Sequence, residues 1–292
     1  MRSDPLVCGP VVGGYRLDGL IGSGQHGDVY LATHPDSGMQ VAVKRLRLPA
    51  GDAQQRGELA RRFVAEAQTT RRLDHPDIVR VLAAGCDEAG PWLVMELLHG
   101  CSLERYTRAA RLLPEPVVVA LVARVARALA CAHAQGVVHR DLKPANVIVD
   151  WGARRVTLSD FGLARDADAE NTRTGLVLGS PDYMAPEQLA GAAAAPAGDL
   201  YALGVMLFEL LAGRRPHEAA SLGELLQQVA QRTPPDLRTL RPELPPALCD
   251  LVAALLSKQP TARPASAAAV ADALDLILST IDSPRRGSKS RP

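Results

Sequence analysis

Two short polar segments carry residue types that could perform chemistry. The first, His139-Arg140-Asp141-Leu142-Lys143-Pro144-Ala145-Asn146, places a carboxylate, an ammonium group and a carboxamide within one loop. The second, Ser159-Asp160-Phe161-Gly162, adds a further carboxylate at the end of an apolar run. Burying so many polar groups is costly unless they meet a ligand or one another. Phosphoryl transfer needs such a set, because it depends on positioned groups that neutralise charge.

A glycine-rich run near the start of the chain could approach phosphates. Gly22-Ser23-Gly24-Gln25-His26-Gly27-Asp28-Val29 matches G-x-G-x-x-G-x-V. The glycines alone are a weak signal, because a dinucleotide-binding turn or a plain hairpin would also contain them. A dinucleotide-binding turn requires a helix after the glycines, whereas the residues from Val29 onward read as a strand. We therefore expect a hairpin whose backbone lies over phosphates.

A cation follows in Val41-Ala42-Val43-Lys44, where strand alternation places Ala42 and Lys44 on the same face. A lysine in that position needs a carboxylate to hold it. Glu66, in the helix expected at about 57–73, is the natural candidate. Taken singly, Glu66 would read as part of a solvated helix face, and only the whole set of motifs favours a role for it.

Composition narrows the class of protein. The chain has 292 residues, of which 47% are hydrophobic and 22% charged, and this is typical of a globular enzyme. A formal charge of +1 gives no overall electrostatic case for binding nucleic acid or an anionic membrane. The five cysteines are scattered and form no C-x-x-C, which argues against a disulfide framework or a zinc site. The same cysteine usage favours a reducing, cytoplasmic location. The apolar runs at 117–123 and 200–211 are too short to cross a bilayer, so we expect no membrane span.

The hydrophobic periodicity changes along the chain. The first third favours strands at 15–17, 29–31, 41–43, 78–83 and 92–96, with one helix among them. Later residues follow a helical period, with a helix between Pro116 and Gly136, an apolar helix at 200–212, and helices beginning after Ser221 and Ser266. These patterns predict a small β-rich lobe at 15–97 and a larger helical lobe at 98–280, with a cleft between them. Residues 1–14 and the basic segment 281–292 are expected to be flexible tails.

The ordered series of motifs, closed by Ala185-Pro186-Glu187, resembles a protein kinase. Lys143 in the catalytic loop and the residues 179–184 resemble the Ser/Thr class, particularly bacterial kinases of the eukaryotic (Hanks) type. The resemblance implies an α+β bilobal protein-kinase fold, with an antiparallel N-lobe sheet plus one helix and a mainly helical C-lobe. It also implies transfer of the ATP γ-phosphate to Ser/Thr hydroxyls of proteins.

The resemblance assigns a role to each candidate residue. Lys44, oriented by Glu66, holds the α- and β-phosphates, and Lys143 stabilises the γ-phosphoryl group in transit. Asp141 orients the acceptor hydroxyl, while Asn146 and Asp160 hold Mg²⁺, with Mn²⁺ as an alternative ion. Ile21, Val29 and Ala42 form the roof of the adenine slot, Ile148 its floor and Met95 its gate, and Glu96 and Leu98 supply backbone groups. The residues expected to contact ATP are therefore Ile21, Gly22, Ser23, Gly24, Gln25, His26, Gly27, Val29, Ala42, Lys44, Met95, Glu96, Leu98, Asn146, Ile148 and Asp160.

Structural and regulatory roles are implied in the same way. Asp199 should cap the backbone near His139 and Arg140, and Glu187 should pair with Arg263. Thr172 and Thr174 match positions in related bacterial kinases, so the resemblance implies autophosphorylation there, and a phosphate on either would pair with Arg140 and order the loop. The expected partners are protein substrates and, transiently, a second copy of the chain.

Three positions depart from the usual family pattern. Ser180 replaces a threonine, His217 a phenylalanine and Thr70 a bulkier apolar residue. The change at Thr70 is expected to weaken the packing behind the helix that carries Glu66.

Two other readings stay open. A pseudokinase, which binds ATP and partners as a scaffold, would normally lack one of Lys44, Asp141, Asn146 or Asp160, and all four are present. A small-molecule kinase of similar fold would normally lack the segment between Asp160 and Glu187. The sequence identifies neither the physiological substrate nor the activating signal.

Overall fold

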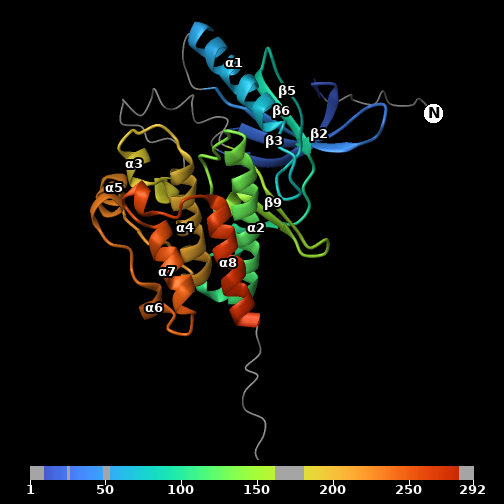
Figure 1. The fold of residues 1–292 in the computed structure, drawn as a ribbon. Helices are drawn as coiled ribbons and strands as arrows, with labels where there is room; N and C mark the ends of the chain where they lie inside the picture. The colour runs from blue at the N-terminus through green and yellow to red at the C-terminus, as the bar shows by residue number, and fades with distance from the viewer. Residues whose placement is uncertain (1–9, 25–26, 49–52, 162–180, 283–292) are drawn as a thin grey trace, which may run out of the picture. The chain divides into compact units, whose positions relative to one another are not determined.

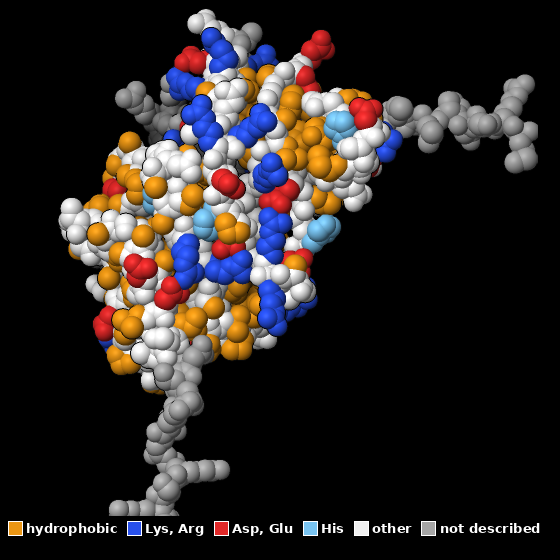
Figure 2. All heavy atoms as spheres, turned by 45° about the vertical axis from the view of Figure 1, so that its right-hand side comes forward, with side chains coloured by type: hydrophobic (Ala, Val, Ile, Leu, Met, Phe, Trp, Pro, Cys, Tyr) orange, Lys and Arg blue, Asp and Glu red, His pale blue; other side chains and the backbone are white. Residues whose placement is uncertain are grey.

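The computed structural model describes residues 10–24, 27–48, 53–161 and 181–282 (Figure 1). These residues divide into two compact units. The first unit runs to His99, and the second begins at Gly100. The predicted lobe boundary, at 97/98, lies close to this division. On the face drawn in Figure 2, acidic, basic and apolar side chains are interspersed.

The described part of the first unit is a six-stranded antiparallel sheet with one long helix. The strands are β1 Val11–Val12, β2 Tyr15–Gly24, β3 Gly27–Thr33, β4 Gln40–Leu46, β5 Val81–Asp87 and β6 Gly90–Glu96, in the order β1-β2-β3-β4-β6-β5. The helix is α1 Ala53–Thr70.

Strand alternation gives this sheet two different apolar faces. On one face, Ala42 and Met95 pack in a cluster with Phe63 and Ala67 of α1. Val41, Val43 and Val94 belong to a separate cluster. Lys44 is two positions from Ala42 along β4, so it lies on the face that α1 covers.

The second unit combines a small sheet with a bundle of helices. Its strands are β7 Cys101–Ser102, β8 Val147–Asp150 and β9 Arg155–Leu158, and its α-helices are α2 Glu115–Ala134, α3 Pro186–Leu189, α4 Pro196–Ala212, α5 Leu222–Gln231, α6 Leu237–Leu240, α7 Pro246–Leu255 and α8 Ala267–Asp282. Short 3₁₀ segments are η1 Leu103–Tyr106, η2 Ala109–Arg111, η3 Pro144–Asn146, η6 Pro181–Tyr183 and η7 Pro260–Ala262. Helices α2, α4, α7 and α8 lie side by side (Figure 1).

Helix α4 is the centre of the second unit. Every residue from Gly198 to Leu211 is buried, as expected for a helix that is apolar nearly all round. Gly204 allows close packing, because a Cβ at this position would lie 2.7 Å from the Cβ of Leu255 in α7. Asp199, in the first turn of α4, is one of the few polar residues of this core and is 1% exposed.

Several predicted boundaries were wrong. Strand β5 begins at Val81 rather than at 78, although Ile78 and Val79 are both buried. The Ile78 amide donates to the His75 carbonyl in a turn, and Ile78 forms only an isolated β-bridge, so this apolar pair fills the core ahead of strand β5. Helix α1 begins at Ala53 and ends at Thr70, earlier than predicted at both ends. Helix α4 begins at Pro196, since proline at the first helical position needs no N–H partner.

Two helical segments, Glu115–Ala134 and Pro260–Ile281, are long and apolar enough to span a membrane by length and composition alone. This corrects the expectation that no apolar segment would reach that length. Helix α2, which forms the first segment, contacts α4, α8 and β9, and it has the character of a core helix. The absence of a membrane span and the cytoplasmic location stay predictions.

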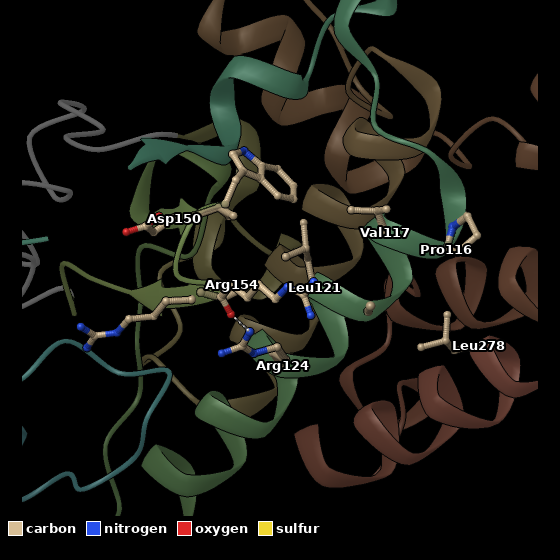
Figure 3. Close-up of a pocket in the computed structure, with 12 residues that line it drawn as sticks. Pro116, Val117, Leu121, Arg124, Asp150, Arg154 and Leu278 are labelled. Atoms are coloured by element: carbon tan, nitrogen blue, oxygen red, sulfur yellow. Dashed lines mark hydrogen bonds between the residues drawn. The ribbon is translucent and has the colours of Figure 1, made fainter. Parts of the chain in front are cut away.

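A mainly apolar groove of about 350 Å³ lies between α2, the β8–β9 hairpin and α8 (Figure 3). Val117 and Leu121 line its α2 side, and Leu278 comes from α8. Arg124 Nη1 donates to the Arg154 carbonyl at 2.8 Å, which ties α2 to the hairpin. The groove therefore belongs wholly to the second unit.

The unusual histidine after Pro216 is buried beside a lysine. His217 is 4% exposed, and its Nε2 lies 3.2 Å from Lys258 Nζ. Burial, reinforced by the positive charge of Lys258, lowers the pKa of His217 to about 4. Burial, reinforced by Arg263, lowers the pKa of Lys258 to about 8. His217 is therefore neutral in the folded protein at neutral pH.

Replacing His217 by phenylalanine is expected to remove an acid sensitivity of folding. Unfolded histidine has a pKa of about 6.5. Below that pH the unfolded chain binds a proton that the folded protein does not bind until about pH 4. Wild-type stability should thus fall as pH decreases through this window, by about 2 kcal/mol near pH 5. Urea unfolding at about pH 7.5 and pH 5 measures this loss.

The loss should be smaller in His217→Phe and unchanged in His99→Phe, which alters an exposed histidine. Equal loss in His217→Phe and wild type would contradict the assignment of the acid sensitivity to His217.

Candidate active site

The glycine-rich run forms the predicted hairpin. Antiparallel pairing of β2 with β3 places Gly22 opposite Val29 and Gly24 opposite Gly27. Asp28 anchors the hairpin by accepting hydrogen bonds from Ser23 Oγ at 2.6 Å and from an Arg47 guanidinium nitrogen at 2.5 Å. Arg47 also donates to the Gly24 carbonyl at 3.1 Å. Gln25 and His26 lie outside the described residues.

The glycines of this hairpin differ in whether the fold itself excludes a larger side chain. Gly27 has φ 148°, and a Cβ at this position would lie 2.0 Å from the Arg45 carbonyl oxygen, so the fold itself requires glycine. Among the described residues outside the immediate chain neighbours, no atom lies within 4 Å of a Cβ built at Gly24, and Val29 Cβ, at 3.8 Å, is the one atom near a Cβ at Gly22. The fold leaves room for side chains at Gly22 and Gly24, and bare backbone there suits the close approach of a phosphate.

Four of the residues predicted to contact adenine share one apolar cluster in the first unit. Ala42 and Met95 are buried in it, and Val29 and Leu98 pack against it. Ile21 is 53% exposed on β2. The remaining predicted apolar contact, Ile148, lies half-buried on β8 of the second unit.

Glu96, the other predicted hinge residue, is tied to the segment before β5. Its amide donates to the Arg80 carbonyl at 3.0 Å. Its Oε1 accepts from the Arg80 amide at 2.9 Å. The Glu96 side chain therefore fixes the end of β6.

Glu66 is half-buried on α1 between Phe63 and Ala67, which pack against the Lys44 face of the sheet. The Lys44–Glu66 ion pair stays a prediction. Thr70, one turn further along, is 3% exposed, and its hydroxyl donates to the Glu66 carbonyl at 3.1 Å. The hydroxyl is thus satisfied within the helix. Its smaller volume is the remaining basis for the predicted weaker packing.

Asp199 shapes the backbone of the catalytic loop. Its carboxylate accepts from the His139 amide at 2.7 Å and the Arg140 amide at 2.9 Å, which confirms the predicted cap. Arg140 has φ +68°, a conformation that non-glycine residues rarely adopt. Asp199 also lies 2.8 Å from His133 Nε2 near the end of α2. One carboxylate of the central helix therefore holds the loop in a strained conformation.

The structure brings together three of the residues predicted to act on the phosphoryl group. Lys143 Nζ lies 2.8 Å from Asp141 Oδ2. Asn146 Nδ2 donates to the same oxygen at 3.1 Å and to the Asp141 carbonyl at 2.7 Å. The Asp141 carboxylate is thus oriented by two side chains of its own loop.

Asn146 is also linked to the segment that carries Asp160. The amide of Ser159 and its hydroxyl both donate to the Asn146 carbonyl, at 2.9 and 3.1 Å. Asp160 follows with φ +55°, another rare conformation for a non-glycine residue. The side-chain nitrogen of Asn146 is committed to Asp141, so its amide oxygen and the Asp160 carboxylate are the donors to consider for a cation. Hard oxygen donors of this kind suit Mg²⁺.

His139 belongs to the site by its contacts, although no side-chain role was predicted for it. It is fully buried, with Nδ1 3.3 Å from the Asp141 amide and Nε2 3.0 Å from the Ser159 carbonyl. An amide can only donate and a carbonyl can only accept, so the neutral ring protonated at Nε2 satisfies both contacts. Burial lowers the pKa of His139, which favours this neutral form. The centres of the His139 and Phe161 rings lie 4.6 Å apart. His139 therefore connects the segment that carries Asp141 with the segment that carries Asp160.

Arg263 confirms the predicted pairing with Glu187. Its guanidinium donates to the two Glu187 carboxylate oxygens at 2.6 and 2.7 Å and to the Ala197 carbonyl at 2.7 Å. The Arg263 side chain has no exposed surface. Thr172, Thr174 and Ser180 lie outside the described residues.

The protein kinase domain family matches residues 15–274. The chain belongs to the protein kinase family. Among its curated relatives, Pkn1 of Myxococcus xanthus is 38% identical over 280 residues, which cover 94% of this chain and 40% of Pkn1. PknJ of Mycobacterium tuberculosis is 40% identical over 92% of this chain and 46% of PknJ. PknA of the same species is 35% identical over 99% of this chain and 67% of PknA. All three are named serine/threonine-protein kinases.

This kinase domain also resembles a solved structure. A crystal structure of Rad53 1–466 in complex with AMP-PNP matches with a TM-score of 0.71 and 23% identity, over 89% of this chain and 64% of the other. The predicted protein-kinase fold and the resemblance to bacterial Ser/Thr kinases are therefore confirmed. The chain spans less than half the length of Pkn1 and PknJ.

Proposed function

We propose that this kinase domain transfers the γ-phosphate of ATP to serine and threonine hydroxyls of proteins. The orientation of Asp141 by Lys143 and Asn146 within one loop carries the proposal. Family membership and the names of the bacterial relatives support it. The presence of all four residues whose loss would mark a pseudokinase favours an active enzyme over a scaffold.

The chemistry follows from the charges in the catalytic loop. Asp141 aligns the acceptor hydroxyl and receives its proton as the phosphoryl group is transferred. Lys143, 2.8 Å away, places a positive charge beside the oxygens that carry negative charge during transfer. Because the transition state is loose, the main contribution of these residues is alignment.

Each unit, taken by itself, contains residues that we assign to nucleotide binding. The bare backbone at Gly22 and Gly24 contacts phosphate oxygens, and Lys44 holds the α- and β-phosphates. Asn146 and Asp160 would hold Mg²⁺, or Mn²⁺ in its place, which neutralises charge on the phosphates when bound. The family match and the AMP-PNP bound by the Rad53 structure support ATP as the nucleotide.

Labelled ATP tests this function directly. The chain is incubated with ATP labelled in the γ-phosphate, a divalent cation and both an acidic and a basic test protein, and the labelled residues are identified after acid hydrolysis. We expect phosphoserine or phosphothreonine, and a loss of roughly 10²-fold or more in Lys44→Met. Label confined to a small molecule, or equal labelling by Lys44→Met, would refute the proposal.

The chain itself is included among the substrates. The proposed sites are Thr172 and Thr174, in the stretch between Asp160 and Glu187. Each phosphate would add a charge of about −1.5 to −2 and three acceptor oxygens that suit an arginine such as Arg140.

A further inference from the structure

A large polar groove opens beside the catalytic loop, wholly within the second unit. It has a volume of about 1090 Å³, and Lys143 and Ala145 of the catalytic loop line it. The other walls come from the segment 102–111, from η6 and from the loop that follows α4. A peptide segment that presents its hydroxyl to Asp141 must lie close to this groove, because Lys143 contacts Asp141.

Arginine dominates the lining. The groove has five arginines and Lys143 against four carboxylates. Four of the arginines, Arg105, Arg108, Arg111 and Arg214, are exposed. Within the part of the chain that the structure describes, none of these four forms an ion pair with a carboxylate. Exposed guanidinium groups that form no ion pair suit an incoming anion.

Most of the lining carboxylates already have partners. Asp182 forms an ion pair with Arg215, the fifth arginine. Glu209 is 8% exposed and accepts from the Tyr183 hydroxyl at 2.6 Å. Glu218 accepts from the Arg215 amide at 3.4 Å. Glu104, on η1, is the remaining one. These acids therefore offer little to a basic substrate, whereas the arginines remain available to an acidic one.

We infer that this groove selects protein substrates with acidic side chains near the phosphorylated serine or threonine. The inference rests on the proposed function and specifies its substrate class. Carboxylates of the substrate pair with Arg105 and Arg108 on one wall and with Arg111 and Arg214 nearby. Electrostatic attraction of this kind raises the rate of encounter and fixes the register of the bound segment, and salt weakens it.

Matched peptides provide the test. Each has one threonine acceptor, and glutamate, alanine or lysine is placed in turn at every neighbouring position. We expect kcat/KM to be about tenfold higher for the best glutamate peptide than for its lysine counterpart, with the preference falling as salt rises. A phosphoserine peptide in the same series shows whether phosphate serves as well as carboxylate.

Variants of the groove then test which arginines cause the preference for acidic peptides. The double change Arg105→Gln and Arg108→Gln should raise KM for the glutamate peptide about five- to tenfold while leaving kcat and transfer to the alanine peptide nearly unchanged. The control, Arg71→Gln with Arg72→Gln, removes the same charge from exposed positions of the first unit and should alter neither.

Equal kcat/KM for glutamate and lysine peptides would overturn the inference. An equal rise in KM for the glutamate peptide in the control variant would overturn it as well. Transfer to peptides without an acidic preference would leave the proposed function intact. No transfer to any peptide or protein would refute the function itself.

Discussion

Replacing Asp141 by asparagine should lower kcat for phosphate transfer by about 10²–10³-fold while leaving ATP affinity nearly unchanged. The two residues have the same shape, but the amide must turn its oxygen toward Lys143 and Asn146, because both of these donate to that position. Its nitrogen then faces the acceptor hydroxyl and cannot receive a proton. Initial rates of transfer, with binding of a fluorescent ATP analogue measured separately, distinguish lost chemistry from lost binding.

A matched control is Asp272→Asn on the exposed side of α8, which should keep full activity. Retention by Asp141→Asn of more than roughly a tenth of wild-type kcat would contradict the role given to Asp141. A large loss of ATP affinity would instead indicate that the substitution disturbs the loop.

Replacing Arg263 by alanine should lower the free energy of unfolding by about 3–5 kcal/mol. The change leaves the half-buried Glu187 carboxylate without its cation and removes donors from the carbonyls of Ala197 and Ser257. The guanidinium also lies 5.1 Å from the centre of the Tyr201 ring, so packing is lost as well. Chemical denaturation monitored by circular dichroism measures the effect.

Two further variants test whether the buried, bidentate ion pair causes the loss of stability. Arg263→Lys should recover little stability, because a single ammonium cannot reproduce a two-pronged pair with Glu187 and the contacts to two carbonyls. Arg238→Ala removes a guanidinium that is 43% exposed and paired with Asp250, and should cost less than about 1 kcal/mol. Similar losses in Arg263→Ala and Arg238→Ala would contradict the importance of burial.

The sequence was most informative where chemistry concentrates polar residues. Asp141, Lys143 and Asn146 could be predicted as a group because a short polar loop beside an apolar strand has few explanations other than a site. The cap by Asp199 and the Glu187–Arg263 ion pair could be predicted only from the family resemblance. Local spacing does not show that residues so far apart in the chain will meet.

Features that depend on tertiary packing could not be predicted. The residues before the catalytic aspartate do not reveal that His139 is fully buried and bonded at both ring nitrogens. Likewise, Ile78 and Val79 have the composition of a strand, and only the turn at His75 shows that they precede it. The Arg47–Asp28–Ser23 network joins polar residues that each look like ordinary surface positions.

The two hydrogen bonds that Ser159 donates to the Asn146 carbonyl constrain any inactive conformation of this kinase. A rearrangement that withdraws the Asp160 carboxylate while Ser159 stays in place must pivot at Asp160 itself, where the backbone already has a positive φ. If the pivot lay earlier, the hydrogen bonds from Ser159 to the Asn146 carbonyl would break, whereas the Asn146 side chain would still be held by Asp141. Inhibitors that trap a withdrawn aspartate should therefore leave the asparagine where it is.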